Sequence, residues 1–94
     1  MTERVLRLFV SGNAASSQRA KETLQQLDKD GLIDGWRLEF VDVLAEPDAA
    51  EKAGILATPT LTCDVHARSR RIVGDFTDKA RMLEFLSIEL GKRP

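Results

Sequence analysis

The sequence predicts an α/β domain in which strands and helices follow one another in the order β-α-β-α-β-β-α. Three observations support this class. An apolar run near the N-terminus precedes a stretch of helical periodicity, an alternating run precedes a shorter helical stretch, and a Thr-Pro pair precedes two strand-like runs and a last amphipathic stretch. Because the chain has 94 residues, it has room for one domain, which we place at residues 1–94.

The first strand and helix are predicted from the N-terminal third. Residues 5–10 are largely apolar, as expected of a buried central strand, and a Ser-Gly-Asn turn follows them. A helix is expected over residues 17–29, ending near Gly31, with Ser16 or Ser17 as its N-cap. The apolar positions at helical spacing are Ala20, Leu24 and Leu27.

A second strand and a short helix follow. Apolar and charged residues alternate over 36–41, which predicts a strand with one face in the core. A short helix is expected over 48–53, with Pro47 in its first turn and Gly54 at its end. Since the connection between the first two strands is long and helical, they should be parallel. The expected core-facing residues of the second strand are Trp36, Leu38 and Phe40.

Pro59 marks the start of the third strand. Proline lacks an N–H group and belongs at the first residue of a strand, and it pushes Thr58 toward an extended conformation. The bond before it can be cis, as beside the active-site loop of thioredoxin folds, or an ordinary trans bond. The residues of this strand expected to face inward are Leu61, Cys63 and Val65.

The chain is expected to close with a hairpin and a helix. Residues 67–69 should connect the third strand to an antiparallel fourth strand at 70–73, which Gly74 ends. A helix is expected over 78–90 because its apolar residues recur at helical spacing. Taken together, the elements form a four-stranded mixed sheet with helices on both faces. This is the thioredoxin topology, in a single domain.

The chemistry of a thioredoxin enzyme is not predicted. Such enzymes carry a thiol in the loop between the first strand and the first helix, where the helix N-terminus lowers its pKa. Residues 11–17 contain no cysteine. Cys63, on an inward strand position, is expected to be a small buried hydrophobe. A reductase or transferase using Cys63 or Ser16 remains the alternative to a protein-binding module.

Composition excludes further classes. The net charge is −1 and basic residues are scattered, so a nucleic-acid partner is not expected. We expect no membrane span or signal peptide, since no apolar run is long enough, and no intramolecular disulfide, since there is one cysteine. These features favour the cytoplasm. His66 is the single histidine, so neither a zinc site nor a cofactor is expected.

Five segments carry a family resemblance. They are LFVSGN at 8–13, Ser17-x-Arg19-Ala20, VDVL-x-x-P at 41–47, ILATPTL at 55–61 and RRIVGD at 70–75. Together they are similar to KaiB, the family of the small protein in the cyanobacterial circadian oscillator, in register from about residue 6 to residue 90. The combination of ILATPTL with RRIVGD is specific.

The resemblance implies a non-catalytic protein. KaiB proteins bind the N-terminal ATPase ring of KaiC, help to sequester KaiA, and compete with the thioredoxin-like sensor domain of the kinase SasA. Clock members change between a ground state, usually tetrameric, with a different C-terminal half, and a thioredoxin-like binding state. The partner-binding residues expected here are Arg37, Glu39, Glu51, Lys52, Gly54 and Ile55. The residues expected to matter for the change of fold are Thr58, Pro59, Gly74, Asp75 and Phe85.

The chain departs from clock members in several places. Glu39 and Gly54 stand where these tend to carry lysine, and residues 66–68 replace a proline run. Phe85 stands near a common mid-helix glycine, and the acidic tail is missing. Because a glycine weakens a helix by up to about 1 kcal/mol, we expect a thioredoxin-like resting state, with a monomer favoured. A ground-state KaiB fold remains the alternative fold. A diverged role in other signalling, or a SasA-like sensor or adaptor role, stays open.

Overall fold

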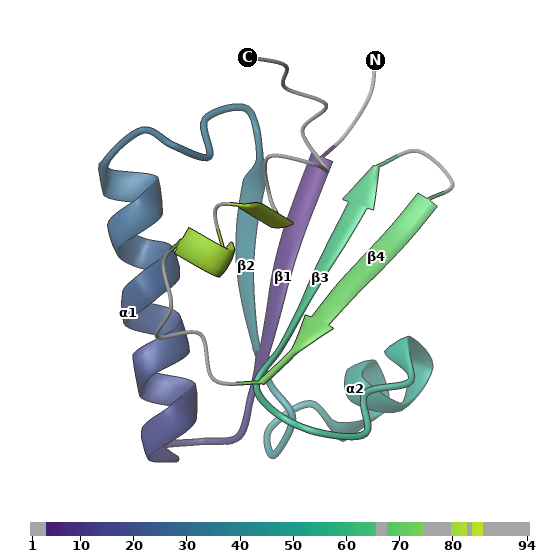
Figure 1. Cartoon of the computed structure of the whole chain (residues 1–94). Coiled ribbons are helices and arrows are strands. Elements are labelled where there is room, and N and C mark those ends of the chain that lie inside the picture. The colour runs from purple at the N-terminus through teal and green to yellow at the C-terminus, as the bar shows by residue number, and fades with distance from the viewer. Residues whose placement is uncertain (1–3, 66–67, 75–79, 83, 86–94) are drawn as a thin grey trace.

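A computed structural model describes residues 4–65, 68–74, 80–82 and 84–85. Over these residues the elements follow one another in the predicted order (Figure 1). The elements are β1 (Arg4–Val10), α1 (Ala15–Lys29), β2 (Arg37–Asp42), α2 (Pro47–Ala53), β3 (Thr60–Val65) and β4 (Arg68–Val73).

The four strands form one mixed sheet in the order β2-β1-β3-β4, which confirms the predicted arrangement. β1 pairs with β2 in parallel, so that Arg7 lies opposite Glu39. β3 is antiparallel to both β1 and β4, and Thr62 lies between Arg7 on one side and Arg71 on the other. β1 is therefore a central strand, as its apolar sequence predicts.

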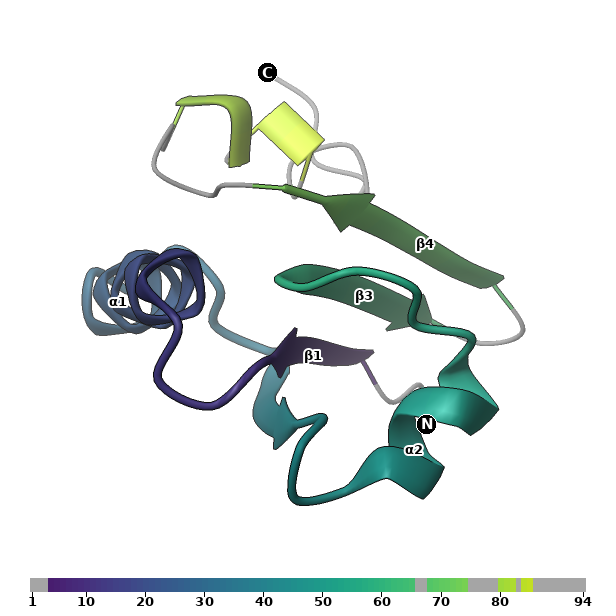
Figure 2. The ribbon, with the colours of Figure 1, turned by 90° about the horizontal axis from the view of Figure 1, so that it is seen from below.

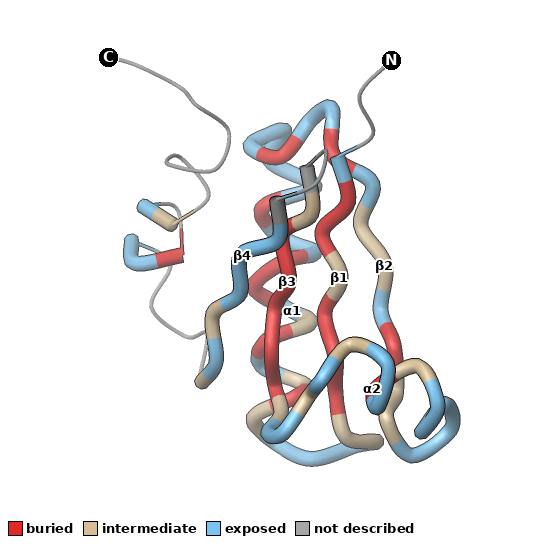
Figure 3. Tube along the Cα trace, turned by 90° about the vertical axis from the view of Figure 1, so that its right-hand side faces the viewer, coloured by how far each residue is buried: buried red, intermediate tan, exposed pale blue. Residues whose placement is uncertain are grey.

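The main core lies between the sheet and α1. Leu6, Leu8 and Val10 alternate along β1 and point to the same face, where they meet the apolar stripe of α1. Figures 2 and 3 show α1 on one side of the sheet and α2 on the other. Met82 packs into the core on the α1 side, and Phe85 packs against it. The other buried members of this core are Ala20, Leu24, Leu27, Ile33, Trp36, Leu61 and Cys63.

The opposite face of the sheet carries a smaller buried region beside α2. Phe9 and Val41 are buried there, and so is Ala50, the one buried residue of α2. Thr60 and Thr62 are buried as well, so β3 is enclosed on both faces along most of its length (Figure 3). The two strands at the sheet edges, β2 and β4, are more exposed.

The start of α1 differs from the prediction. The helix begins at Ala15, and the capping position is occupied by Ala14, which makes no side-chain hydrogen bond. Ser16 and Ser17 are not caps but belong to the first turn. The Ser17 hydroxyl is fully buried and accepts a hydrogen bond of 3.0 Å from the backbone N–H of Ser11, so it joins the helix to the preceding loop.

Two further predictions on the strands were wrong. Phe40 was expected in the core but is 36% exposed, because β2 is an edge strand and Lys21 of α1 lies 5.9 Å above its ring. Arg68 and Ser69 were expected in the hairpin connection but belong to β4. Their pairing with Val65 and Asp64 continues the β3–β4 ladder beyond the predicted strand.

The predicted last helix is described in part. Residues 80–82 and 84–85 have helical backbone, and Phe85 is half-buried. This agrees with the helix expected over this segment in a thioredoxin-like state. Asp75, His66, and residues 86–90 lie outside the described residues.

Candidate protein-binding surface

The helix α2 presents most of its surface outward. Pro47 occupies its first turn, where a missing N–H costs nothing, and Asp48 lies near the positive end of the helix. Gly54 ends the helix with φ of 69°, a left-handed conformation that favours glycine. Since only Ala50 is buried, the side chains of Glu51 and Lys52 extend into solvent.

The segment between α2 and β3 exposes an apolar side chain. Leu56 is 99% exposed, whereas the preceding Ile55 is half-buried. The bond between Thr58 and Pro59 is cis, the first of the two alternatives considered for it. The Thr60 hydroxyl donates a hydrogen bond of 2.6 Å to the Ala57 carbonyl oxygen, which fixes the end of this segment to β3.

An arginine of the fourth strand contacts the C-terminal end of α2. The Arg71 guanidinium donates hydrogen bonds to the carbonyl oxygens of Ala53, at 2.9 Å, and Gly54, at 3.2 Å. The last carbonyl groups of a helix have no partner within it and carry a partial negative charge. Arg71 therefore satisfies the C-terminal end of α2 and joins that helix to β4.

A chain of ion pairs crosses the sheet on the face that α2 occupies. Glu39 lies between Arg7 and Arg37, at 2.9 Å from each guanidinium, and Arg7 also reaches Asp64 at 3.5 Å. The hydrogen bond from Arg7 lowers the pKa of Glu39, against a smaller opposing effect of burial. Glu39 is thus held ionised by residues of two neighbouring strands.

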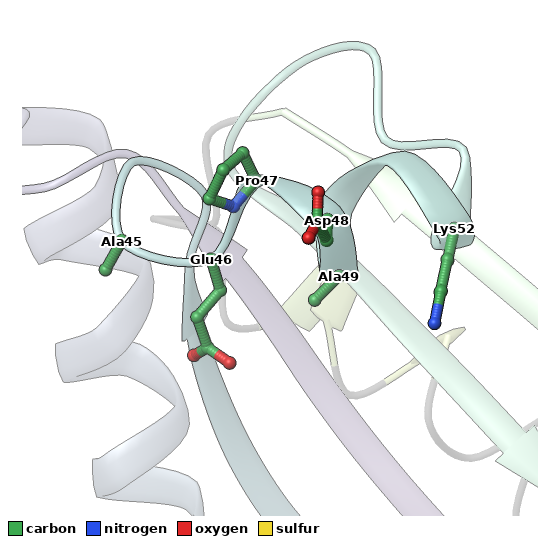
Figure 4. Close-up of a pocket in the computed structure, with 6 residues that line it drawn as sticks. All are labelled: Ala45, Glu46, Pro47, Asp48, Ala49 and Lys52. Atoms are coloured by element: carbon green, nitrogen blue, oxygen red, sulfur yellow. The ribbon is translucent and has the colours of Figure 1, made fainter.

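Two hollows adjoin α2. One, of about 430 Å³, is lined by residues 45–49 and Lys52, at the start of the helix and the loop before it, and the Glu46 and Lys52 side chains extend the same way (Figure 4). The other, of about 290 Å³, lies over the sheet between α2 and β4. Its lining residues are Arg7, Phe9, Lys52, Ala53, Thr62, Asp64, Ser69 and Arg71.

The loop after β1 is built by backbone hydrogen bonds. One carboxylate oxygen of Asp42 accepts hydrogen bonds from the N–H groups of Leu44, at 2.9 Å, and Gly12, at 3.0 Å. These bonds lower the pKa of Asp42. Gly12 has φ of 52°, and a Cβ atom there would lie 3.1 Å from Leu44. The loop is therefore a close-packed turn, and Leu44 above it is 71% exposed.

The Cys63 thiol is buried among core residues, as expected of a small hydrophobe. Within the part of the chain that the structure describes, no three His, Cys, Asp or Glu side chains gather closely enough to hold a metal ion. The helices of residues 4–65, 68–74, 80–82 and 84–85 include none that is long and apolar enough to cross a membrane.

The predicted partner-binding residues fall into two groups. Glu51, Lys52, Gly54 and Ile55 lie together on α2 and just after it. Arg37 and Glu39 lie on β2, with Arg37 at the strand's first residue, far along the strand from its α2 end (Figure 1). Three residues around these groups were not among the predicted ones. Arg7 pairs with Glu39 of the β2 group and with Asp64, and Arg71 donates to Gly54 of the α2 group.

One signal could have identified Arg7. A charged residue in the middle of an otherwise apolar central strand needs a partner when partly buried, and Arg7 finds two across the sheet. Arg71 belongs to the RRIVGD motif, but its bond to α2 depends on where α2 lies relative to β4, which no local pattern reports.

Comparison with known proteins agrees with the sequence motifs. The KaiB domain family matches residues 7–88. The chain is 40% identical over 79 residues to the circadian clock oscillator protein KaiB of Synechococcus sp. (strain RCC307), covering 84% of this chain and 72% of that one. It is also 40% identical over 79 residues to the protein of the same name from Rippkaea orientalis, with 84% and 76% coverage.

Solved structures of similar shape include thioredoxins. A mutant thioredoxin from Halobacterium salinarum superposes with a TM-score of 0.81 at 17% identity, covering 98% of this chain and 79% of that chain. Fasciola hepatica thioredoxin gives 0.79 at 18% identity, with 93% and 81% coverage. At this identity the likeness shows the fold alone, a thioredoxin-like one. The fold, the motifs and the sequence relatives agree, and the chain belongs to the KaiB family.

Proposed function

We propose that this chain is a non-catalytic protein-binding module of the KaiB type. It binds a KaiC-type ATPase and modulates the phosphorylation cycle or the output signalling of that partner. Proteins resembling KaiA or SasA are further candidates for its partners. Its place of action is the cytoplasm, where a KaiC-type ATPase would be met.

The observation that carries this proposal is the surface formed by α2 and the segment after it. This surface combines an almost fully exposed Leu56 with the charged side chains of Glu51 and Lys52. Exposed apolar residues next to charges are typical of protein interfaces, in which the apolar group contributes affinity and the charges tune the association rate. It lies in the part of the chain that matches the KaiB family.

A redox enzyme is the weaker alternative. Thiol chemistry needs an accessible thiolate, whereas Cys63 is buried in the core and the loop at residues 11–14 has no cysteine. Incubation with a disulfide substrate and a reductant tests this alternative. Turnover above that of a Cys63→Ser control would establish an enzyme and overturn the proposal.

Binding is tested directly with a purified KaiC-type ATPase from the same organism. We expect a saturable complex by biolayer interferometry, weakened or strengthened by Glu39→Lys and weakened by Lys52→Glu. Lys29→Glu, at the far end of α1, is the matched control. The absence of a complex with well-folded protein, by circular dichroism, would refute the proposed partner.

A further inference from the structure

The smaller hollow on the sheet is a consequence of strand register. Thr62 of β3 lies opposite Arg7 of β1 and opposite Arg71 of β4, so a short side chain stands between two long ones in one row across the sheet. Neighbouring side chains in such a row are about 5 Å apart. Where the guanidinium groups of the two arginines lie decides how much room is left beside the threonine.

The guanidinium groups of both arginines are bound to partners other than Thr62. The Arg7 guanidinium is turned to Glu39, at 2.9 Å, and to Asp64, at 3.5 Å. The Arg71 guanidinium donates to the carbonyl groups at the end of α2. Thr62 itself is buried, at 4% exposure, and the hollow of about 290 Å³ that it helps to line lies beside it, between α2 and β4.

The charged side chains that line this hollow are mainly cationic. Three basic side chains and one carboxylate contribute to it, and the carboxylate, Asp64, is paired with Arg7. The Lys52 side chain makes no hydrogen bond or ion pair with the residues that the structure describes. The positive charge beside α2 is thus left for an external group, together with the hydroxyl of Ser69, an exposed residue on the opposite wall.

The size of the hollow indicates what kind of anion it accepts. Sites for metabolites and cofactors usually exceed about 300 Å³ and enclose their ligand. This hollow is slightly smaller and open to solvent, which suits one side chain of a larger molecule. A carboxylate entering it would lie between a lysine and an arginine, and ion pairs in a partly desolvated cleft are stronger than those at an open surface.

We propose that this hollow receives an aspartate or glutamate side chain from the protein partner. Lys52 of α2 and Arg71 of β4 line it from two elements, and the buried Thr62 and Phe9 line it from the sheet. The inference rests on the proposed function, because Lys52 also belongs to the surface assigned there. It adds the chemistry of the contact: the partner presents an acidic residue to the sheet side of α2.

The test uses the whole protein, labelled with ¹⁵N, and two short peptides that differ only in carrying glutamate or glutamine at the same positions. We expect the glutamate peptide to shift the amide signals of Lys52, Thr62 and Ser69, and added salt to weaken its binding. Lys52→Glu should lower its affinity about tenfold, whereas the control Lys29→Glu should leave it unchanged. Equal shifts with both peptides would overturn the proposal, and so would a hollow that binds inorganic phosphate but not the glutamate peptide.

The same variants distinguish this inference from the proposed function. Suppose that a KaiC-type ATPase binds the wild type, and that it binds Lys52→Glu and Thr62→Leu, in which a larger side chain would occupy the hollow, with the same affinity. The hollow is then not used, and this inference fails while the proposed function stands. If the glutamate peptide binds in the hollow but no KaiC-type ATPase binds, the proposed partner fails and the acidic contact stands. Circular dichroism of Thr62→Leu establishes that the variant is folded, and Lys52→Glu gives the result without altering the sheet.

Discussion

Arg71 in β4 donates a hydrogen bond of 2.9 Å to the carbonyl oxygen of Ala53, in the last turn of α2. The contact joins α2 to a strand that is not its neighbour along the chain. The same guanidinium also donates to the carbonyl oxygen of Gly54. α2 has seven residues, too few for a helix to be stable by itself in water, and it buries only Ala50. Its position on the sheet therefore depends on contacts of this kind.

Replacement of Arg71 should loosen α2 without unfolding the domain. We expect Arg71→Gln to destabilise the docked helix by about 1 kcal/mol, which is roughly a fivefold increase in local opening, because a charged donor to two helix carbonyls is lost at an exposed site. Hydrogen exchange of the Gly54 and Ile55 amides, whose bonds close the helix, measures this effect. Arg71→Lys should recover part of the protection. Unchanged exchange in α2 would contradict the role assigned to Arg71.

The ion pairs of Glu39 predict a dependence of stability on pH. The pKa of Glu39 is lowered in the folded protein by Arg7, so the carboxylate stabilises the fold above its unfolded pKa of about 4.3. This contribution should disappear as the pH falls through the lower, folded pKa. Glu39 is about one-third exposed, so we expect less than about 1 kcal/mol.

Urea unfolding of the wild type and of Glu39→Gln at several pH values measures this contribution. The wild type should be the more stable at pH 7, and the difference should shrink below pH 4. A difference between the two proteins that does not vary with pH would show that the ion pairs of Glu39 do not stabilise the fold.

Leu56 should contribute to binding and not to folding. Its side chain is 99% exposed, so Leu56→Ser should change the free energy of unfolding by less than about 0.5 kcal/mol. The affinity of the Leu56→Ser protein for a KaiC-type ATPase should fall about tenfold if Leu56 is buried at the interface. Leu32→Ser, an exposed leucine in the loop between α1 and β2, is the control and should bind normally. Equal affinities for the wild type, Leu56→Ser and Leu32→Ser would show that Leu56 is not part of the binding surface.

The two serines at the start of α1 should differ sharply in their effect on stability. Ser17→Ala leaves the Ser11 N–H group without its acceptor, which costs about 1–2 kcal/mol. Ser16→Ala removes no such bond and should change the free energy of unfolding by less than about 0.5 kcal/mol. Both substitutions change helix propensity equally, so their difference in thermal unfolding isolates the buried bond. A larger loss for Ser16→Ala would support the capping role first predicted for it.

The candidate site could be predicted from the sequence only in part. Lys52, Gly54 and Ile55 follow from a short helix with a proline at its start and a glycine at its end, and the structure places them together. Arg37, grouped with them in the prediction, lies at the other end of β2. Sequence spacing could not exclude it, since it does not show how far along a strand a neighbouring helix reaches. The bond from Arg71 to α2 brings together residues 18 positions apart, which no local pattern encodes.

By itself, the sequence determined the order of the elements, the central position of β1 and the burial of Cys63, because apolar periodicity reports which side of an element meets the core. The family motifs, too, can be recognised from the sequence alone. Tertiary structure alone decided that Phe40 is exposed on an edge strand, that Ser17 joins a helix to its loop, and that Arg7 and Arg71 stand on either side of Thr62. These depend on sheet order and strand register, which bring together residues that are remote in the sequence.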